Sequence, residues 1–202
     1  MLEDVERVEV STRVMELMAR HDVPFQRGDV VDFFGVLGPF LERFTVSPLD
    51  HPAGLQSARI KYIFTIWNVV VDDDIDRVGS ASELLRSLTF LSHVARVDDH
   101  LQWIPSTPAQ WLLHAVFLEL LDVAPWESWR HLVFDVYKHA MGFYYEWMAN
   151  HYGLPNSAEY AVFSTLTTDL SVYVDIDRVV SGDDVRDVEY ARLRSACMEL
   201  SR

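Results

Sequence analysis

Four carboxylates, Asp72, Asp73, Asp74 and Asp76, directly follow an apolar stretch of the chain. On a helix, Asp72 and Asp76 are one turn apart and Asp73 lies beside them, so three carboxylates share one side of the last turn. This end also carries the negative pole of the helix dipole, where stacked anions are unfavourable unless a cation binds. Carboxylate oxygens suit Mg²⁺, which takes one or two carboxylates together with substrate phosphates. The spacing therefore predicts Asp72, Asp73 and Asp76 as Mg²⁺ ligands; the alternative is a solvated acidic helix end.

These aspartates form the pattern D-D-x-x-D after an aromatic-rich segment. The pattern resembles the first metal motif of class I terpene synthases, especially the bacterial terpene cyclases. The resemblance implies that Asp72, Asp73 and Asp76 are catalytic and bind the Mg²⁺ ions that hold a C10, C15 or C20 isoprenyl diphosphate. It also implies a lyase reaction, in which the metals draw off diphosphate and the remaining allylic carbocation cyclises.

A second stretch of resemblance lies downstream, at Glu146, Trp147 and Asn150 and over 153–155 and 158–160. These residues are similar to the segment that precedes the diphosphate-sensing helix of the bacterial cyclases. Together, the two stretches align most of the chain with the sequence pattern of the family.

In that register, Asp169 matches the family's linker acid, which implies a role in substrate binding. The sensor arginine does not match, because Leu166 stands three residues before Asp169. Arg178 is followed by two valines and then by the small residues Ser181 and Gly182. This repeats the family's pattern of an arginine, two further residues and a break in the helix, but further along the chain. Arg178 could therefore substitute as the diphosphate sensor. The alternative for Arg178 is an ion pair with Asp175 or Asp177 on the same helix.

The second metal motif of the family, an Asn or Asp, then Ser or Thr, then Glu on one helix face, is not found in the sequence. By register it would begin at or just after Arg202, where the sequence stops, so the resemblance covers the first two-thirds of the family's domain.

Two alternatives to a terpene synthase stay open. One is a non-catalytic or vestigial protein that keeps the fold and the first motif. The other is a chain-elongating prenyltransferase, a class with two Asp-rich motifs where this chain has one.

The spacing of apolar residues favours helices throughout, because they recur every three or four residues and period-two alternation never persists. The predicted fold class is all-α, and the resemblance implies the class I isoprenoid synthase bundle, incomplete at the C-terminus. Capping patterns open helices at Ser80–Glu83 and Thr107–Gln110. The eight expected helices cover about 3–20, 29–45, 53–77, 81–97, a segment from 107, about 125–152, a segment from 156, and about 185–202.

The central expected helix would position the aspartates above a pocket. With about 100° per residue, Thr65 and Asn68 fall within about 40° of Asp72, and Phe64 and Val69 within about 80°. We therefore expect these four side chains to bind substrate in a cavity below the metals.

Aromatic side chains on this helix have two interpretations. The ring of Phe64 could stabilise a carbocation by cation–π attraction, worth about 2 kcal/mol where water is excluded. Core packing is the alternative for Phe64, and it is the interpretation that we favour for Trp67, which lies on the opposite side of the helix.

The composition limits the remaining possibilities. With 202 residues the chain fits one domain over 1–202, and its formal net charge of −14 argues against a nucleic-acid partner. The N-terminus lacks the pattern of a secretory signal, and no apolar run is long enough to span a membrane. The single Cys197 is compatible with a reducing compartment, so we expect a cytoplasmic protein.

The last expected helix continues to Arg202 with no glycine stop. In the family that the chain resembles, further helices would close the cavity on this side. We therefore expect the 202 residues to be a fragment of a longer chain, to self-associate as a homodimer, or to need a partner that supplies the missing ligands.

Overall fold

The computed structural model describes residues 3–25, 28–42, 52–75, 77, 80, 104–153, 156, 158, 170–182 and 187–200. Within these ranges the chain forms seven helices and no strand, which confirms the predicted all-α class. The expected helix at 81–97 lies outside the described residues, as does most of the segment from 156. None of the described helices combines the length and apolar character needed to cross a bilayer.

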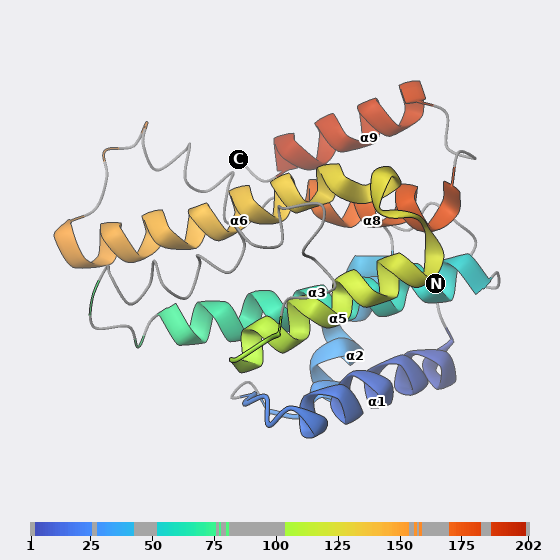
Figure 1. Ribbon diagram of the computed structural model, residues 1–202, viewed down its shortest axis with the longest axis horizontal. Helices are drawn as coiled ribbons and strands as arrows, with labels where there is room; N and C mark the ends of the chain where they lie inside the picture. Colours follow the sequence, from blue (N-terminus) through green and yellow to red (C-terminus); the bar gives the residue numbers. More distant parts are fainter. Residues whose placement is uncertain are drawn as a thin grey trace.

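Helix α3 (Pro52–Ile75) is the element around which the others pack. Figure 1 shows α3 and α5 in the middle of the molecule, with α1 and α2 on one side and α8 and α9 on the other. Five helices contact α3 directly, and α9 (Asp187–Leu200) packs on α8. The five are α1 (Asp4–Arg20), α2 (Val30–Glu42), α5 (Pro108–Val123), α6 (Trp126–Tyr152) and α8 (Ser171–Ser181).

Several helix ends follow the signals in the sequence. The side chain of Thr107 caps α5 by accepting a hydrogen bond from the backbone N–H of Gln110 at 3.3 Å, and Pro108 occupies the first helical position. Helix α6 ends at Gly153, whose φ of 116° is readily adopted only by glycine. The backbone N–H of Gly153 donates to the carbonyl of Ala149, which satisfies one of the last free carbonyls of α6.

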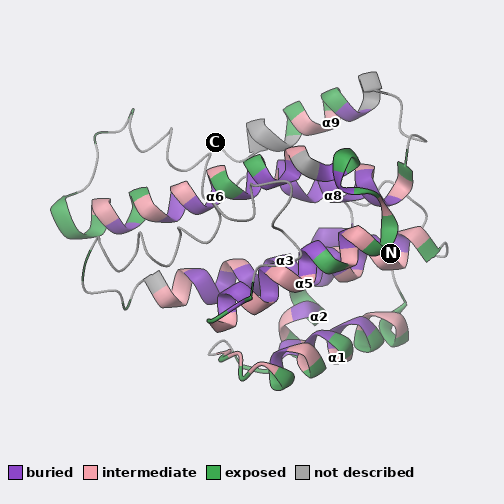
Figure 2. Cartoon of the chain, viewed as in Figure 1, coloured by how far each residue is buried: buried purple, intermediate pink, exposed green. Residues whose placement is uncertain are grey.

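The core is formed by the faces that α3 shares with its neighbours. Figure 2 shows the buried residues concentrated along α3, α5 and α8. The largest fully buried aromatic side chains are those of Phe34, Tyr62, Phe64, Trp67 and Trp129. Because α3 is covered on several sides, its apolar stretch before the aspartates is buried almost without interruption.

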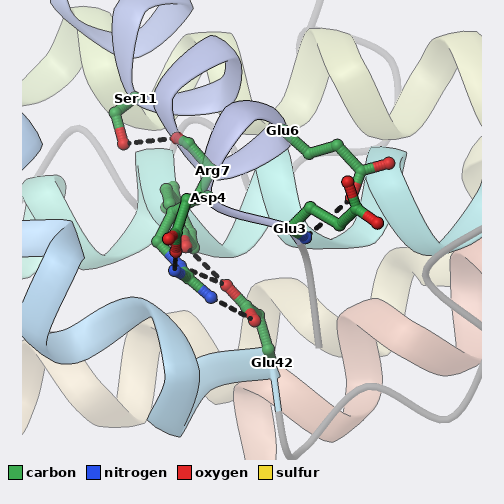
Figure 3. Close-up of polar contacts among 7 residues, drawn as sticks. Glu3, Asp4, Glu6, Arg7, Ser11 and Glu42 are labelled. Carbon is green, nitrogen blue, oxygen red and sulfur yellow. Dashed lines mark hydrogen bonds and ion pairs between the residues drawn. The ribbon is translucent and has the colours of Figure 1, made fainter.

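A polar contact joins the first three helices. Arg7 on α1 donates to both carboxylate oxygens of Glu42 on α2, at 2.9 and 3.1 Å, and Figure 3 shows this pair. The hydroxyl of Tyr62 on α3 donates to the same carboxylate at 3.0 Å. Burial and the charge of Glu42 raise the pKa of Tyr62, so the phenol keeps its proton and remains a donor. Glu42 therefore links α1, α2 and α3, and Arg7 and Tyr62 compensate its charge.

Candidate functional site

The acidic end of α3 is only partly covered by the protein. Asp72, Asp73 and Asp74 are half-buried in the last turn of the helix, whereas Val69, Val70 and Val71 directly before them are buried. Burial raises the pKa of Asp74, and the charge of Asp73 adds to this effect, against the opposing charge of Arg77. The last turn thus concentrates negative charge at the negative pole of a buried helix, an arrangement that a bound cation would relieve.

The predicted third ligand, Asp76, lies outside the described residues. Within the described ranges, no three His, Cys, Asp or Glu side chains gather closely enough to hold a metal ion. The residues that are described fit Mg²⁺ by their chemistry, since one or two carboxylates, water and substrate phosphates complete its coordination. The assignment of Asp72, Asp73 and Asp76 as Mg²⁺ ligands therefore stays a prediction.

One turn below Asp72, the polar face of α3 lies against α8. The hydroxyl of Thr65 is 3.1 Å from the hydroxyl of Tyr173, and the amide nitrogen of Asn68 donates to the same hydroxyl at 3.4 Å. Burial raises the pKa of Tyr173, so this phenol stays protonated. The side-chain oxygen of Asn68, Oδ1, is buried and has no hydrogen-bond partner in the part of the chain that the structure describes.

The apolar residues predicted for the same cavity are packed in the core. Phe64 stacks on Trp67 with ring centroids 5.2 Å apart and meets the edge of Tyr173 at 5.5 Å. Trp67 and Val69 are buried, and Trp67 also lies edge-on to Phe143 of α6 at 6.3 Å. The interpretation of Trp67 as a core residue is confirmed. In the seam between α3 and α8, Phe64 therefore meets Tyr173 directly, and the roles of Phe64 and Val69 in substrate binding stay predictions.

Further along the seam, a buried ion pair joins the two helices. Lys61 on α3 and Asp177 on α8 both have fully buried side chains, and the Lys61 Nζ lies 2.7 Å from an oxygen of Asp177. The hydroxyl of Ser57 donates to the other carboxylate oxygen of Asp177. These contacts fix α3 antiparallel to α8, with Tyr173 near the aspartates and Asp177 toward the other end.

Arg178 follows Asp177 and therefore lies far from the acidic end of α3. Lys61 and Asp72 are about three turns apart on α3, or about 16 Å, so the aspartates and Arg178 are not brought together. The suggested partners of Arg178 contact other helices: Asp177 binds Lys61, and Asp175 accepts from the Tyr190 hydroxyl of α9. Asp169, the predicted linker acid, lies outside the described residues.

Comparison of the chain with protein-family models, curated proteins and solved structures found no match.

A second acidic cluster joins α6, α8 and α9 and was not predicted. Asp135 of α6 accepts from Arg194 Nη2 at 2.9 Å and pairs with Lys138 at 2.5 Å. Asp175 of α8 accepts from the Tyr190 hydroxyl and from Arg194 Nε at 3.4 Å. The sequence signal for this cluster is Asp175, an acid inside the apolar run of α8.

The two carboxyl groups of this cluster share a proton. Burial, together with the hydrogen bond and charge of Asp135, raises the pKa of Asp175 to about 8, against the opposing effect of Arg194. Burial alone would raise the pKa of Asp135, but hydrogen bonds from Asp175 and Lys138 bring it below its usual value. The proton therefore resides on Asp175, while Asp135 is ionised.

This shared proton predicts a pH dependence of stability. A carboxyl group with a raised pKa in the folded state loses its proton more easily in the unfolded state, so the free energy of unfolding falls as pH rises from about 4 to about 8. We expect urea midpoints of the wild type to fall across this range and those of Asp175→Asn to fall less, because asparagine cannot titrate. Asp122→Asn, at an exposed acid, serves as the control. Equal pH slopes for Asp175→Asn and the wild type would contradict the shared proton.

Proposed function

We propose that the acidic end of α3 binds Mg²⁺ together with an isoprenyl diphosphate, and that the protein is a terpene synthase. The observation that supports this proposal is the position of Asp72 and Asp73. Their carboxylates are half-buried at the end of a helix whose preceding residues form the core. A cation at this position offsets both their mutual repulsion and the helix dipole, and it provides a contact for a diphosphate.

In this proposal the residues of the chain have distinct roles. Asp72 and Asp73, with Asp76, hold the metal, which when bound supplies a Lewis acid for the departure of diphosphate. Thr65 and Asn68 hold the Tyr173 hydroxyl one to two turns below, which fixes the wall next to the site. The ring of Phe64 lies deeper on the same helix, where it meets the Tyr173 ring and excludes water from this wall.

A second candidate function is a protein that binds the diphosphate without turnover. It is favoured by the packing of α3 against α8, because Phe64 and Thr65 are buried and both contact Tyr173. Cyclisation requires room for a prenyl chain next to the metals, whereas diphosphate binding at the exposed edge of the last turn does not. The two candidates share the metal site and differ in turnover.

The metal site is tested by removing its carboxylates one at a time. We expect Asp72→Asn and Asp73→Asn to weaken Mg²⁺-dependent binding of farnesyl diphosphate at least tenfold, measured by titration calorimetry with geranyl and geranylgeranyl diphosphate in parallel. Helicity and melting temperature should be unchanged or improved, because each substitution removes repulsion at the negative pole of α3.

The matched control is Asp122→Asn, which removes an exposed carboxylate from the last turn of α5. This variant changes the net charge equally and should bind as the wild type does. Equal affinity in wild type, Asp72→Asn and Asp73→Asn, or binding that persists in excess chelator, would rule out the proposed metal site.

A further inference from the structure

A cavity of about 540 Å³ lies where the end of α5, the start of α6 and the end of α8 meet. This volume is typical of sites for small organic molecules. Its apolar wall includes Val123, Val179 and Val180, and its polar lining includes Ser128, His131 and Arg178. Since Arg178 lies next to Asp177 and away from Asp72, this cavity is separate from the acidic end of α3.

Arg178 provides a fixed positive charge in this cavity. Its guanidinium carbon lies 4.3 Å from the centroid of the Tyr190 ring, a cation–π contact that orients the side chain. Arg178 also stands in the last turn of α8, where the helix dipole favours a cation. A guanidinium presents N–H groups in a planar fork that matches two oxygens of a carboxylate or phosphate.

His131 provides a second polar group in the same lining. Its Nε2 is buried and has no hydrogen-bond partner among the described residues. Burial lowers the pKa of His131, and the charges of Arg178 and Arg194 add to this effect, against the opposing charge of Asp135. The imidazole is therefore neutral at pH 7, and an anion beside it would stabilise its protonated form.

From these contacts we infer that the cavity binds the oxyanion head group of a small organic molecule, a phosphate or a carboxylate. Arg178 pairs with the oxyanion, the valine side chains cover an apolar tail, and His131 in the lining responds to the charge of the bound anion. The site takes its ligand without a divalent metal, because its charge comes from protein side chains. Its occupation is therefore independent of the Mg²⁺ site proposed at Asp72.

The test follows the imidazole resonances of His131 by NMR, assigned with a His131→Gln variant, in buffer that contains a chelator. The probes are hexyl phosphate and hexanoate, which share a tail and differ in head group, and hexanol, which has the tail alone. We expect both anions to shift the His131 resonances and to raise its pKa by about one unit, while hexanol leaves them unchanged. A stronger effect of one anion identifies the preferred head group.

Variants then test the role of Arg178. Arg178→Gln is expected to weaken anion binding at least tenfold. Arg178→Lys keeps the positive charge but lacks the planar set of N–H groups, and it is expected to weaken binding less. Arg192→Gln, at an exposed arginine of α9, removes the same charge and should bind as the wild type does.

The wild-type titrations decide the proposal even if Arg178→Gln does not fold. Absence of any His131 shift with both anions, or an equal shift with hexanol, would overturn it. Failure of this test leaves the metal site at Asp72 unaffected, because no Mg²⁺ is present in the titration.

Discussion

Replacement of Lys61 by methionine is expected to lower the free energy of unfolding by about 3–5 kcal/mol. The Lys61 ammonium and the Asp177 carboxylate are 2.7 Å apart, and neither side chain is exposed to solvent. Methionine keeps most of the length of the side chain but leaves the Asp177 carboxylate buried without its compensating charge. The loss should appear as a lower midpoint in urea denaturation, with an unchanged dependence on urea concentration.

Two further variants separate the buried charge from other effects of the substitution. Lys61→Met combined with Asp177→Asn should recover much of the lost stability, because no uncompensated charge remains. Arg13→Met breaks the exposed pair of Arg13 with Glu9 and should cost less than about 1 kcal/mol. A Lys61→Met protein within 1 kcal/mol of the wild type would show that the seam between α3 and α8 is not packed as described.

A second large effect is expected at Gly38, where α2 packs against α1 and α3. A Cβ atom at this position would overlap the Tyr62 hydroxyl and lie 3.0 Å from two atoms of the Arg7 side chain. The Gly38→Ala substitution must therefore displace the donors that bind Glu42. We expect it to lower the free energy of unfolding by about 1–3 kcal/mol, despite the better helix propensity of alanine.

Gly35 provides the matched control on the same helix. A Cβ atom at Gly35 would meet no atom within 4 Å, so Gly35→Ala should stabilise the protein by about 1 kcal/mol through helix propensity alone. Opposite signs for the two substitutions in thermal and urea denaturation are the expected result. Stabilisation by both would mean that Tyr62 and Arg7 do not contact Gly38.

The helices were predictable where the sequence carries local signals. Thr107 and Pro108 start α5 as expected, and the predicted central segment of about 53–77 corresponds to α3 at Pro52–Ile75. The expected helix of about 29–45 corresponds to α2 at Val30–Glu42, which continues through Pro39. Helix α8 was not predicted as a separate element, since Leu170 at its start provides no capping side chain.

Only the part of the candidate site that lies on α3 was predictable from the sequence. The periodicity of α3 placed Thr65 and Asn68 on the side of Asp72, and both contact Tyr173 of α8. Which element covers that side depends on tertiary packing, so the periodicity gave no indication of the buried pair of Lys61 with Asp177. Charged residues at buried positions are recognised in a sequence only when their partners are known.

Aromatic side chains are exposed along α6. Phe134, Tyr137 and Tyr145 on α6 are exposed, with Phe134 exposed to 65%. The homodimer stays a prediction, as do the cytoplasmic location and the single domain.

The most direct test of the proposed terpene synthase is product analysis with the purified protein and Mg²⁺. C10, C15 and C20 isoprenyl diphosphates are supplied separately, and released diphosphate is quantified together with the organic products by mass spectrometry. We expect at least one substrate to yield diphosphate and a cyclic product, with activity lost in Asp72→Asn and retained in Asp122→Asn. No release of diphosphate from any of the three substrates, or equal release by the wild type and Asp72→Asn, would contradict the proposal.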